Sequence, residues 1–245
     1  MKFQTIGNPN DSLIIMLPGS FCPSSGLNYL YEKLKDDYCI VLVEYNGHYE
    51  NSTFSSRQNE AKGIVEYIQK QNIHTIKMIY GQSMGAEIAI ELFKQLEKTN
   101  INVDYCFLDG ASCIKLPYLY KKFMHFKFNQ ILKMMKKKEV DQILNMKLIK
   151  KIARGNTENL RPMIEPMALI AQFLTKESVK NETECCYTFD FPSFDKETQN
   201  KMYFFYGKEE KAYKTCYSGV KKAYLQANSI FKEGYGHLMY FNVFY

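Results

Sequence analysis

The sequence lacks any run of apolar residues long enough to cross a membrane as a helix, which requires roughly 18 or more. Residues 1–7 also lack the apolar stretch of a secretory signal. We therefore expect a cytoplasmic protein. No recognition motif accompanies the moderate net charge of +6, so nucleic acid is not expected as a partner. Internal repeats and low-complexity linkers are absent as well.

Paired cysteines are also missing. The seven cysteines are an odd number without the paired spacing of a zinc site, although Cys185 and Cys186 are adjacent. In a reducing cytosol such residues serve mostly as small buried apolar side chains. We expect neither a metal nor another cofactor.

What is present indicates a folded α/β protein. Hydrophobic residues make up 46% and charged residues 24% of the 245 residues, close to the values of soluble folded domains. Short apolar runs, typical of parallel strands buried on both faces, alternate with longer stretches of helical spacing. The pattern predicts a mostly parallel sheet with helices on both faces. Strands are predicted at residues 12–17, 38–44, 75–80, 103–108, 202–206 and 229–231, and helices at 24–35, 57–71, 84–98 and 210–225.

The composition changes after residue 110. Basic residues far outnumber acidic ones from 115 to 154, and helical spacing replaces the strand-like runs. We predict a core formed by residues 1–110 and 191–245, with a helical cap, or lid, inserted at 111–190. Helices are expected within this cap near residues 118–138, 140–153 and 163–177.

The predicted cap is rich in aromatic, methionine and lysine side chains. The apolar ones either line an adaptable acyl pocket or form the core of the cap itself. The lysines form a solvated face, attract anionic substrates, or contact an anionic membrane surface. The apolar residues are Phe123, Met124, Phe126, Phe128, Met134 and Met135, and the lysines are Lys121, Lys122, Lys136, Lys137, Lys138, Lys150 and Lys151.

Residues 81–85 read Gly-Gln-Ser-Met-Gly, with Ser83 at the centre. An alcohol is a poor nucleophile at neutral pH, so a catalytic serine must be held beside a base. A sharp strand-to-helix turn presents it, provided that the positions two before and two after are small, as Gly81 and Gly85 are. A strand pattern precedes the motif and a helix pattern follows it. The alternative is a tight turn with an incidental serine.

Four segments of the chain resemble the α/β-hydrolase family, and outside the cap the resemblance covers nearly the whole length. The first is the motif around Ser83. Residues 17–20 are similar to the oxyanion loop of the family, with Pro18 in place of the usual histidine. Residues 44–48 with Ser52 resemble its Asp-x-x-Gly-His-Gly-x-Ser stretch, and residues 234–237 resemble its terminal histidine loop. The resemblance implies an α/β-hydrolase fold and a serine hydrolase or esterase with a helical cap.

His237 is the candidate general base. It follows the last predicted strand, at the sheet edge where the nucleophile turn should also lie. The chain order, with serine first, histidine last and the acid between them, also fits the family. For His48, His74 and His125 we expect structural or solvated roles.

Two carboxylates compete for the role of triad acid. The family usually places it a few residues after the penultimate strand, and Glu210 is three residues after Gly207. A rarer variant of the family places it after the strand that follows the nucleophile helix, where Asp109 lies. Each residue also has a non-catalytic interpretation. Glu210 would then be a surface charge, and Asp109 would cap a turn before Gly110.

The family mechanism also needs two N–H donors for the oxyanion. Met84, directly after the nucleophile, supplies one from its backbone. Ser20 is expected to supply the other, or Phe21 if the turn is one residue longer.

These features predict a hydrolase that cleaves a carboxylic ester or thioester through an acyl-enzyme on Ser83, with His237 as base. Its partner would be a small, partly apolar acyl substrate. Carbon–carbon bond hydrolysis and acyl transfer would use the same triad. A membrane-associated lipase is a further variant, and a non-catalytic protein of this fold that binds a ligand or partner is the competing class.

Overall fold

The structure is a computed structural model that describes residues 1–152, 157–210 and 213–236. Within these residues, seven strands form one sheet in the order β1-β3-β2-β4-β5-β6-β7. β1 is antiparallel to β3, and all other neighbours are parallel. This arrangement confirms the predicted fold class. The strands are β1 (Lys2–Ile6), β2 (Leu13–Leu17), β3 (Cys39–Glu44), β4 (Thr75–Gln82), β5 (Asn102–Asp109), β6 (Met202–Gly207) and β7 (Asn228–Lys232).

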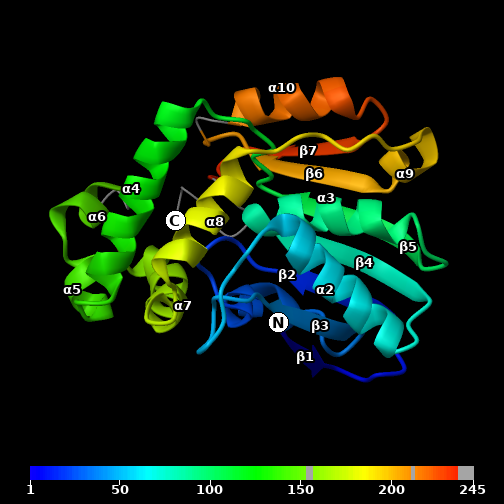
Figure 1. Ribbon diagram of the computed structural model, residues 1–245, viewed down its shortest axis with the longest axis horizontal. Helices are drawn as coiled ribbons and strands as arrows, with labels where there is room; N and C mark the ends of the chain where they lie inside the picture. The colour runs from blue at the N-terminus through cyan, green and yellow to red at the C-terminus, as the bar shows by residue number, and fades with distance from the viewer. Residues whose placement is uncertain (153–156, 211–212, 237–245) are drawn as a thin grey trace.

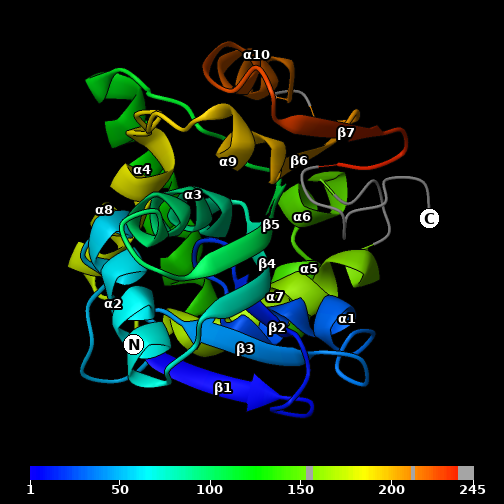
Figure 2. The ribbon, with the colours of Figure 1, turned by 90° about the vertical axis from the view of Figure 1, so that its right-hand side faces the viewer.

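Helices cover both faces of the sheet. α2 (Arg57–Lys70) and α3 (Met84–Leu96) lie on one face, and α1 (Asn28–Tyr31) lies on the other (Figure 2). A 3-10 turn, Ser24–Leu27, leads into α1. α10 (Tyr213–Ala223) packs into the same hydrophobic cluster as α2 and α3, and the short α9 (Lys196–Asn200) precedes β6.

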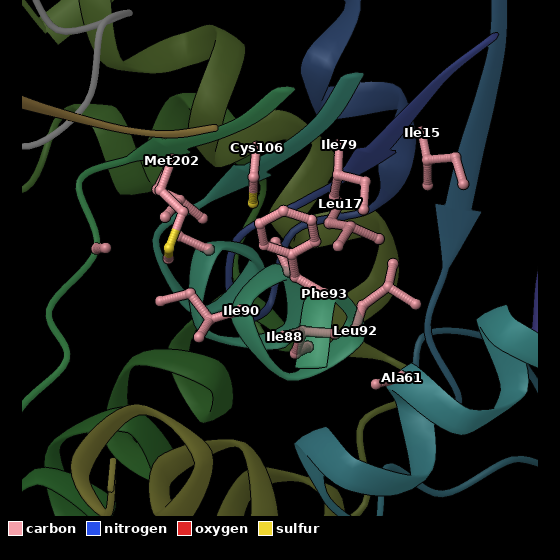
Figure 3. Packing of buried hydrophobic residues seen from close by; sticks show 14 of the residues in the cluster. Ile15, Leu17, Ala61, Ile79, Ile88, Ile90, Leu92, Phe93, Cys106 and Met202 are labelled. Carbon is pink, nitrogen blue, oxygen red and sulfur yellow. The ribbon is translucent and has the colours of Figure 1, made fainter. Parts of the chain in front are cut away.

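The larger hydrophobic cluster lies between the sheet and α3. Ile88 and Leu92 of α3 are fully buried, and the ring of Phe93 points toward the strands that carry Ile79 and Cys106 (Figure 3). Every residue of β2 is buried, as expected for a parallel strand covered on both faces. The strand ends and the start of α3 are therefore held in fixed positions.

A group of helices separates β5 from β6 in the sequence, and Figure 1 shows most of it to the left of the sheet. These helices have their own hydrophobic cluster, to which Leu132, Ile143 and Ile164 belong. The chain enters and leaves the group through segments that pair with each other, Leu116 N–H to Tyr187 O at 3.0 Å and Phe189 N–H to Ile114 O at 3.0 Å. The helices are α4 (Tyr118–Met135), α5 (Val140–Leu144), α6 (Lys147–Ile152), α7 (Arg161–Ala171) and α8 (Lys176–Tyr187), with a 3-10 turn at Thr157–Leu160.

Several predicted helix limits were wrong. The single helix expected at 163–177 is two helices, because Thr175 begins a new one by accepting the N–H of Ser178 at 3.0 Å. The helix expected at 140–153 is divided into α5 and α6, and that at 24–35 contains only one short α-helix. The prediction of a cap at 111–190 that closes over a ligand stays a prediction.

Candidate active site

Ser83 occupies a sharp turn between β4 and α3. Its backbone has φ 52° and ψ −117°, an unfavourable region for a residue with a Cβ atom. A Cβ on Gly81 would lie 2.4 Å from the carbonyl oxygen of Gly85, and one on Gly85 would lie 2.3 Å from Leu17 O. Both positions therefore require glycine, as the sequence pattern predicted for a nucleophile turn. Ser83 is half-buried.

The loop after β2 lies directly beside this turn. A Cβ atom on Gly19 would be 3.5 Å from the Cβ of Ser83. The backbone N–H groups of Ser20 and Met84 make no hydrogen bond within the described parts of the chain. These are the two N–H groups that the sequence predicted as oxyanion donors, a role that stays a prediction.

Phe21, the alternative donor, is engaged elsewhere. Its N–H donates a 2.8 Å hydrogen bond to Glu182 Oε2, although 161 residues separate the two in sequence. The N–H of Phe21 thus already has an acceptor. The N–H of Ser20 has none among the described residues.

Asp109 ends β5 next to the turn. The N–H of Ser83 donates to its carbonyl oxygen at 2.8 Å, and its fully buried carboxylate accepts the hydroxyl of Tyr80 at 2.7 Å. Burial, together with the charge of Asp109, raises the pKa of Tyr80 well above its usual value, so this hydroxyl stays protonated and donates. The Tyr29 hydroxyl is 3.1 Å from that of Tyr80 and accepts from Gln82 Nε2 at 3.0 Å.

Glu210 lies just beyond β6, as the sequence predicted. It is half-buried, and its N–H donates to Gly207 O at 3.3 Å. Burial, aided by the charge of Glu210, raises the pKa of the Cys216 thiol to about 12. Asp109 and Glu210 thus lie at the carboxyl ends of neighbouring strands, and the choice between them as triad acid stays a prediction.

His237, the predicted base, lies outside the described residues. The segment before it is described up to Gly236. A Cβ atom on Gly207 would be 2.1 Å from Gly236 O, and Glu209 N–H donates to Tyr235 O at 3.0 Å. The described end of this segment therefore lies across the carboxyl end of β6, on the same sheet edge as Ser83.

A second polar cluster lies behind the loop of residues 19–24. His48 is buried, with Nδ1 3.2 Å from Glu44 Oε1 and Nε2 3.0 Å from Glu182 Oε1. Burial alone lowers the pKa of His48, but the charge and hydrogen bond of Glu182, joined by those of Glu44, raise it to about 10. The structural role expected for His48 agrees with this position. Glu182 was not identified from the sequence, because nothing near residue 182 indicates a contact with residues 21 and 48.

The apolar residues of the predicted cap divide into two groups. Met135 is buried in the cluster of these helices, and Phe128 and Met134 pack against it. Phe123 and Phe126 of α4 are 55% and 59% exposed. Tyr118, Leu119 and Tyr120, the first three residues of α4, are also exposed. α4 contains four lysines and no acidic residue.

The described residues contain neither a candidate metal site nor a candidate membrane-spanning helix. Among them, no group of three or more histidine, cysteine, aspartate or glutamate side chains could hold a metal ion. No helix in those parts is long and apolar enough to cross a membrane. The seven cysteines all lie in the described ranges and are unpaired, and six of them are buried.

The chain matches no protein-family model. No curated protein matches it either.

Solved structures do match. An α/β-hydrolase family protein from Desulfitobacterium hafniense has a TM-score of 0.70 at 17% identity, over 96% of this chain and 91% of its own. An esterase from a marine microorganism has a TM-score of 0.67 at 16% identity, over 96% of this chain and 92% of its own. The naproxen esterase of Bacillus subtilis, carboxylesterase NP, gives 0.67 at 13% identity, over 98% and 82%. Likeness at these identities concerns the fold, and we conclude that this chain has the α/β-hydrolase fold.

Proposed function

We propose that the protein is a serine hydrolase that cleaves a carboxylic ester or thioester through an acyl-enzyme on Ser83. The observation that carries the proposal is the strained turn at Ser83, with φ 52°, beside the N–H groups of Ser20 and Met84. Backbone strain of this kind persists only where the surroundings impose it, and it clusters at active sites. The esterase names of structures with the same fold also support hydrolysis.

In the first step, Ser83 Oγ attacks the acyl carbon while its proton passes to His237. The negative charge on the carbonyl oxygen is stabilised by the N–H groups of Ser20 and Met84. The carbon–oxygen or carbon–sulfur bond then breaks, and the leaving group takes the proton from His237. Water attacks the acyl-enzyme with His237 again as base, which releases the acid and restores Ser83. Glu210, or in the second reading Asp109, orients the imidazole.

The aromatic side chains near the loop favour an apolar acyl group. The rings of Phe21 and Phe128 are 5.0 Å apart, and that of Phe128 stacks on Tyr187 at 6.3 Å. Phe21 directly follows the proposed oxyanion donor, and its ring packs in the hydrophobic cluster of the helices between β5 and β6. Such rings bind hydrocarbon chains by burying apolar surface.

Turnover of graded substrates tests the proposal. Nitrophenyl esters and acyl thioesters of increasing chain length should be hydrolysed by the wild type and by Ser193→Ala, a control at an exposed serine. Ser83→Ala should lose at least about 10³-fold in kcat. Equal turnover by Ser83→Ala and the wild type would contradict the proposal. Comparing the esters with the thioesters identifies the bond that is preferred.

Other chemistry remains compatible with the same residues. A carbon–carbon bond hydrolase or an acyltransferase would use the same nucleophile and donors, and would show poor ester hydrolysis with normal active-serine labelling. A non-catalytic ligand- or partner-binding protein of this fold would show neither labelling nor turnover.

One observation supports a lipase that works at a membrane surface. Five large apolar side chains on α4 are between 55% and 75% exposed, in a helix with lysines and no acidic residue. Exposed apolar side chains on a basic helix suit the surface of an anionic bilayer. Salt-sensitive sedimentation with phosphatidylserine vesicles, abolished by Phe123→Asp with Phe126→Asp, is the expected result. Leu225→Asp, at an exposed leucine outside α4, is the control. Absence of wild-type binding would contradict this variant.

A further inference from the structure

We infer that Glu182 is a positioning residue for the oxyanion hole, which it holds in place through the backbone of Phe21. The inference rests on the proposed function and adds to it a residue outside the triad and the donors. Glu182 belongs to α8, among the helices between β5 and β6, whereas Phe21 follows β2. The geometry of the loop would therefore depend on a helix that is distant in sequence.

The first observation is the conformation of Phe21. Its φ is 58°, in the left-handed region that residues with a Cβ atom rarely adopt. Its N–H belongs to the peptide that links it to Ser20, so the direction of this N–H and the conformation of the donor residue are coupled. Some contact must hold this peptide in place, since the local backbone does not favour it.

Glu182 supplies that contact. Its carboxylate is fully buried, and Oε2 accepts the N–H of Phe21 at 2.8 Å. A hydrogen bond to a charged acceptor is stronger than one between neutral groups. The Phe21 ring is held as well, because it packs at 5.0 Å against Phe128 of α4. Both contacts come from the helices between β5 and β6.

His48 offsets the cost of burying the negative charge of Glu182. Two carboxylates lie behind the loop, since Glu44 Oε2 accepts the N–H and hydroxyl of Ser24 at 3.0 and 2.9 Å. His48 lies between Glu44 and Glu182, with one ring nitrogen on each. A protonated imidazole there balances one of the two negative charges and uses both of its N–H groups. The loop is thus anchored at Phe21 and at Ser24 by acceptors that share one histidine.

This arrangement predicts a specific kinetic defect. Deleting an oxyanion donor outright costs about 10²- to 10³-fold in kcat, so displacing one should cost about 10- to 100-fold. The Michaelis constant should change little, because the oxyanion exists only after attack. A purely structural role would lower the amount or stability of folded protein and leave the kcat of the folded fraction unchanged.

The test compares Glu182→Leu with Glu182→Gln. Leucine removes both acceptors at similar volume, so kcat should fall about 10- to 100-fold with KM within about 3-fold. Glutamine keeps an oxygen for the Phe21 N–H and should restore most of the activity. Affinity for a trifluoromethyl ketone, whose adduct with Ser83 carries an oxyanion, should fall in parallel with kcat/KM. The same substitutions at Glu184, whose carboxylate instead accepts from Lys121 at 2.7 Å, are the control and should have no effect.

Glu182→Asp keeps the test valid if the leucine variant does not fold. Aspartate retains a charge for His48 but withdraws the carboxylate by one methylene, so kcat should still fall. Wild-type kcat in folded Glu182→Leu or Glu182→Asp, or equal losses in the leucine and glutamine variants, would overturn the positioning role. Lack of Ser83-dependent turnover in the wild type would contradict the proposed function itself, which is a separate result.

Discussion

The N–H of Ser83 donates a 2.8 Å hydrogen bond to the carbonyl oxygen of Asp109. The nucleophile turn is thereby joined to the end of β5, where Gln82 and Asp109 are register partners. Residues that follow parallel strands meet at one edge of the sheet, and here they include both candidates for the triad acid.

Replacement of each acid separates these candidates. We expect Glu210→Gln to lower kcat by roughly 10⁴-fold, the loss typical when the acid of a triad becomes an amide. Asp109→Asn should act mainly on stability, because its buried carboxylate accepts the Tyr80 hydroxyl. Steady-state kinetics and urea denaturation of both variants measure this. The reverse pattern would make Asp109 the acid.

Close backbone packing predicts the effect of Gly85→Ala. The new Cβ would lie 2.3 Å from Leu17 O and 2.5 Å from Pro18 O, so the loop that follows them must move away from Ser83. We expect a loss of at least about 10-fold in kcat, with a lower melting temperature. Gly63→Ala is the control, since its Cβ would meet only the flexible end of Met1 at 3.3 Å. Unchanged kcat in Gly85→Ala would contradict the proposed contact.

Glu87 predicts a loss of stability as pH rises. Burial raises its pKa from 4.5 to about 8, only partly offset by the N–H of Cys113 and the charge of Arg57. Between these values the unfolded chain releases a proton that the folded chain retains, so the folded state weakens by at most about 1.4 kcal/mol per pH unit. Glu87→Gln should lack this decline. Urea denaturation from pH 5 to pH 8 measures the free energy of unfolding of both proteins. The value for the wild type should fall with pH relative to that for Glu87→Gln, and a constant difference between the two would refute the expectation.

The buried His48 predicts a second loss of stability, at higher pH. Its folded pKa of about 10 exceeds the usual 6.5, so its stabilisation is complete below about pH 6.5 and is lost as pH rises toward 10. Glu44 and Glu182 contact the imidazole, and Glu60 lies within electrostatic range of it. The stability advantage of the wild type over His48→Gln should therefore shrink from pH 7 to pH 10. An advantage that does not change with pH would indicate a neutral His48.

The sequence predicted the elements whose cause is local. β2 is a continuous apolar run, and the glycines around Ser83 have a steric requirement that a short motif can reveal. β1 was not predicted, because it is an edge strand whose residues are mostly exposed and lack a clear apolar pattern. The limits of α7 and α8 were misplaced, since helical spacing alone does not locate a break.

The supporting residues could not be predicted for a different reason. Glu182 contacts Phe21 and His48, which are 161 and 134 residues away in the sequence. The residues next to Glu182 have the pattern of an ordinary polar helix face. Tyr80 reads as part of a buried strand, and only the register of β4 and β5 places its hydroxyl on Asp109. Contacts of this kind follow from the assembled fold and not from any local pattern.

Labelling with a fluorophosphonate tests the central claim most directly, because the probe reacts only with a serine that is activated as a nucleophile. Wild type and Ser193→Ala should each be labelled once, on the peptide that contains Ser83, and Ser83→Ala should not be labelled. Labelling of Ser83→Ala at the wild-type rate, or none in folded wild type, would contradict the assignment of Ser83 as nucleophile.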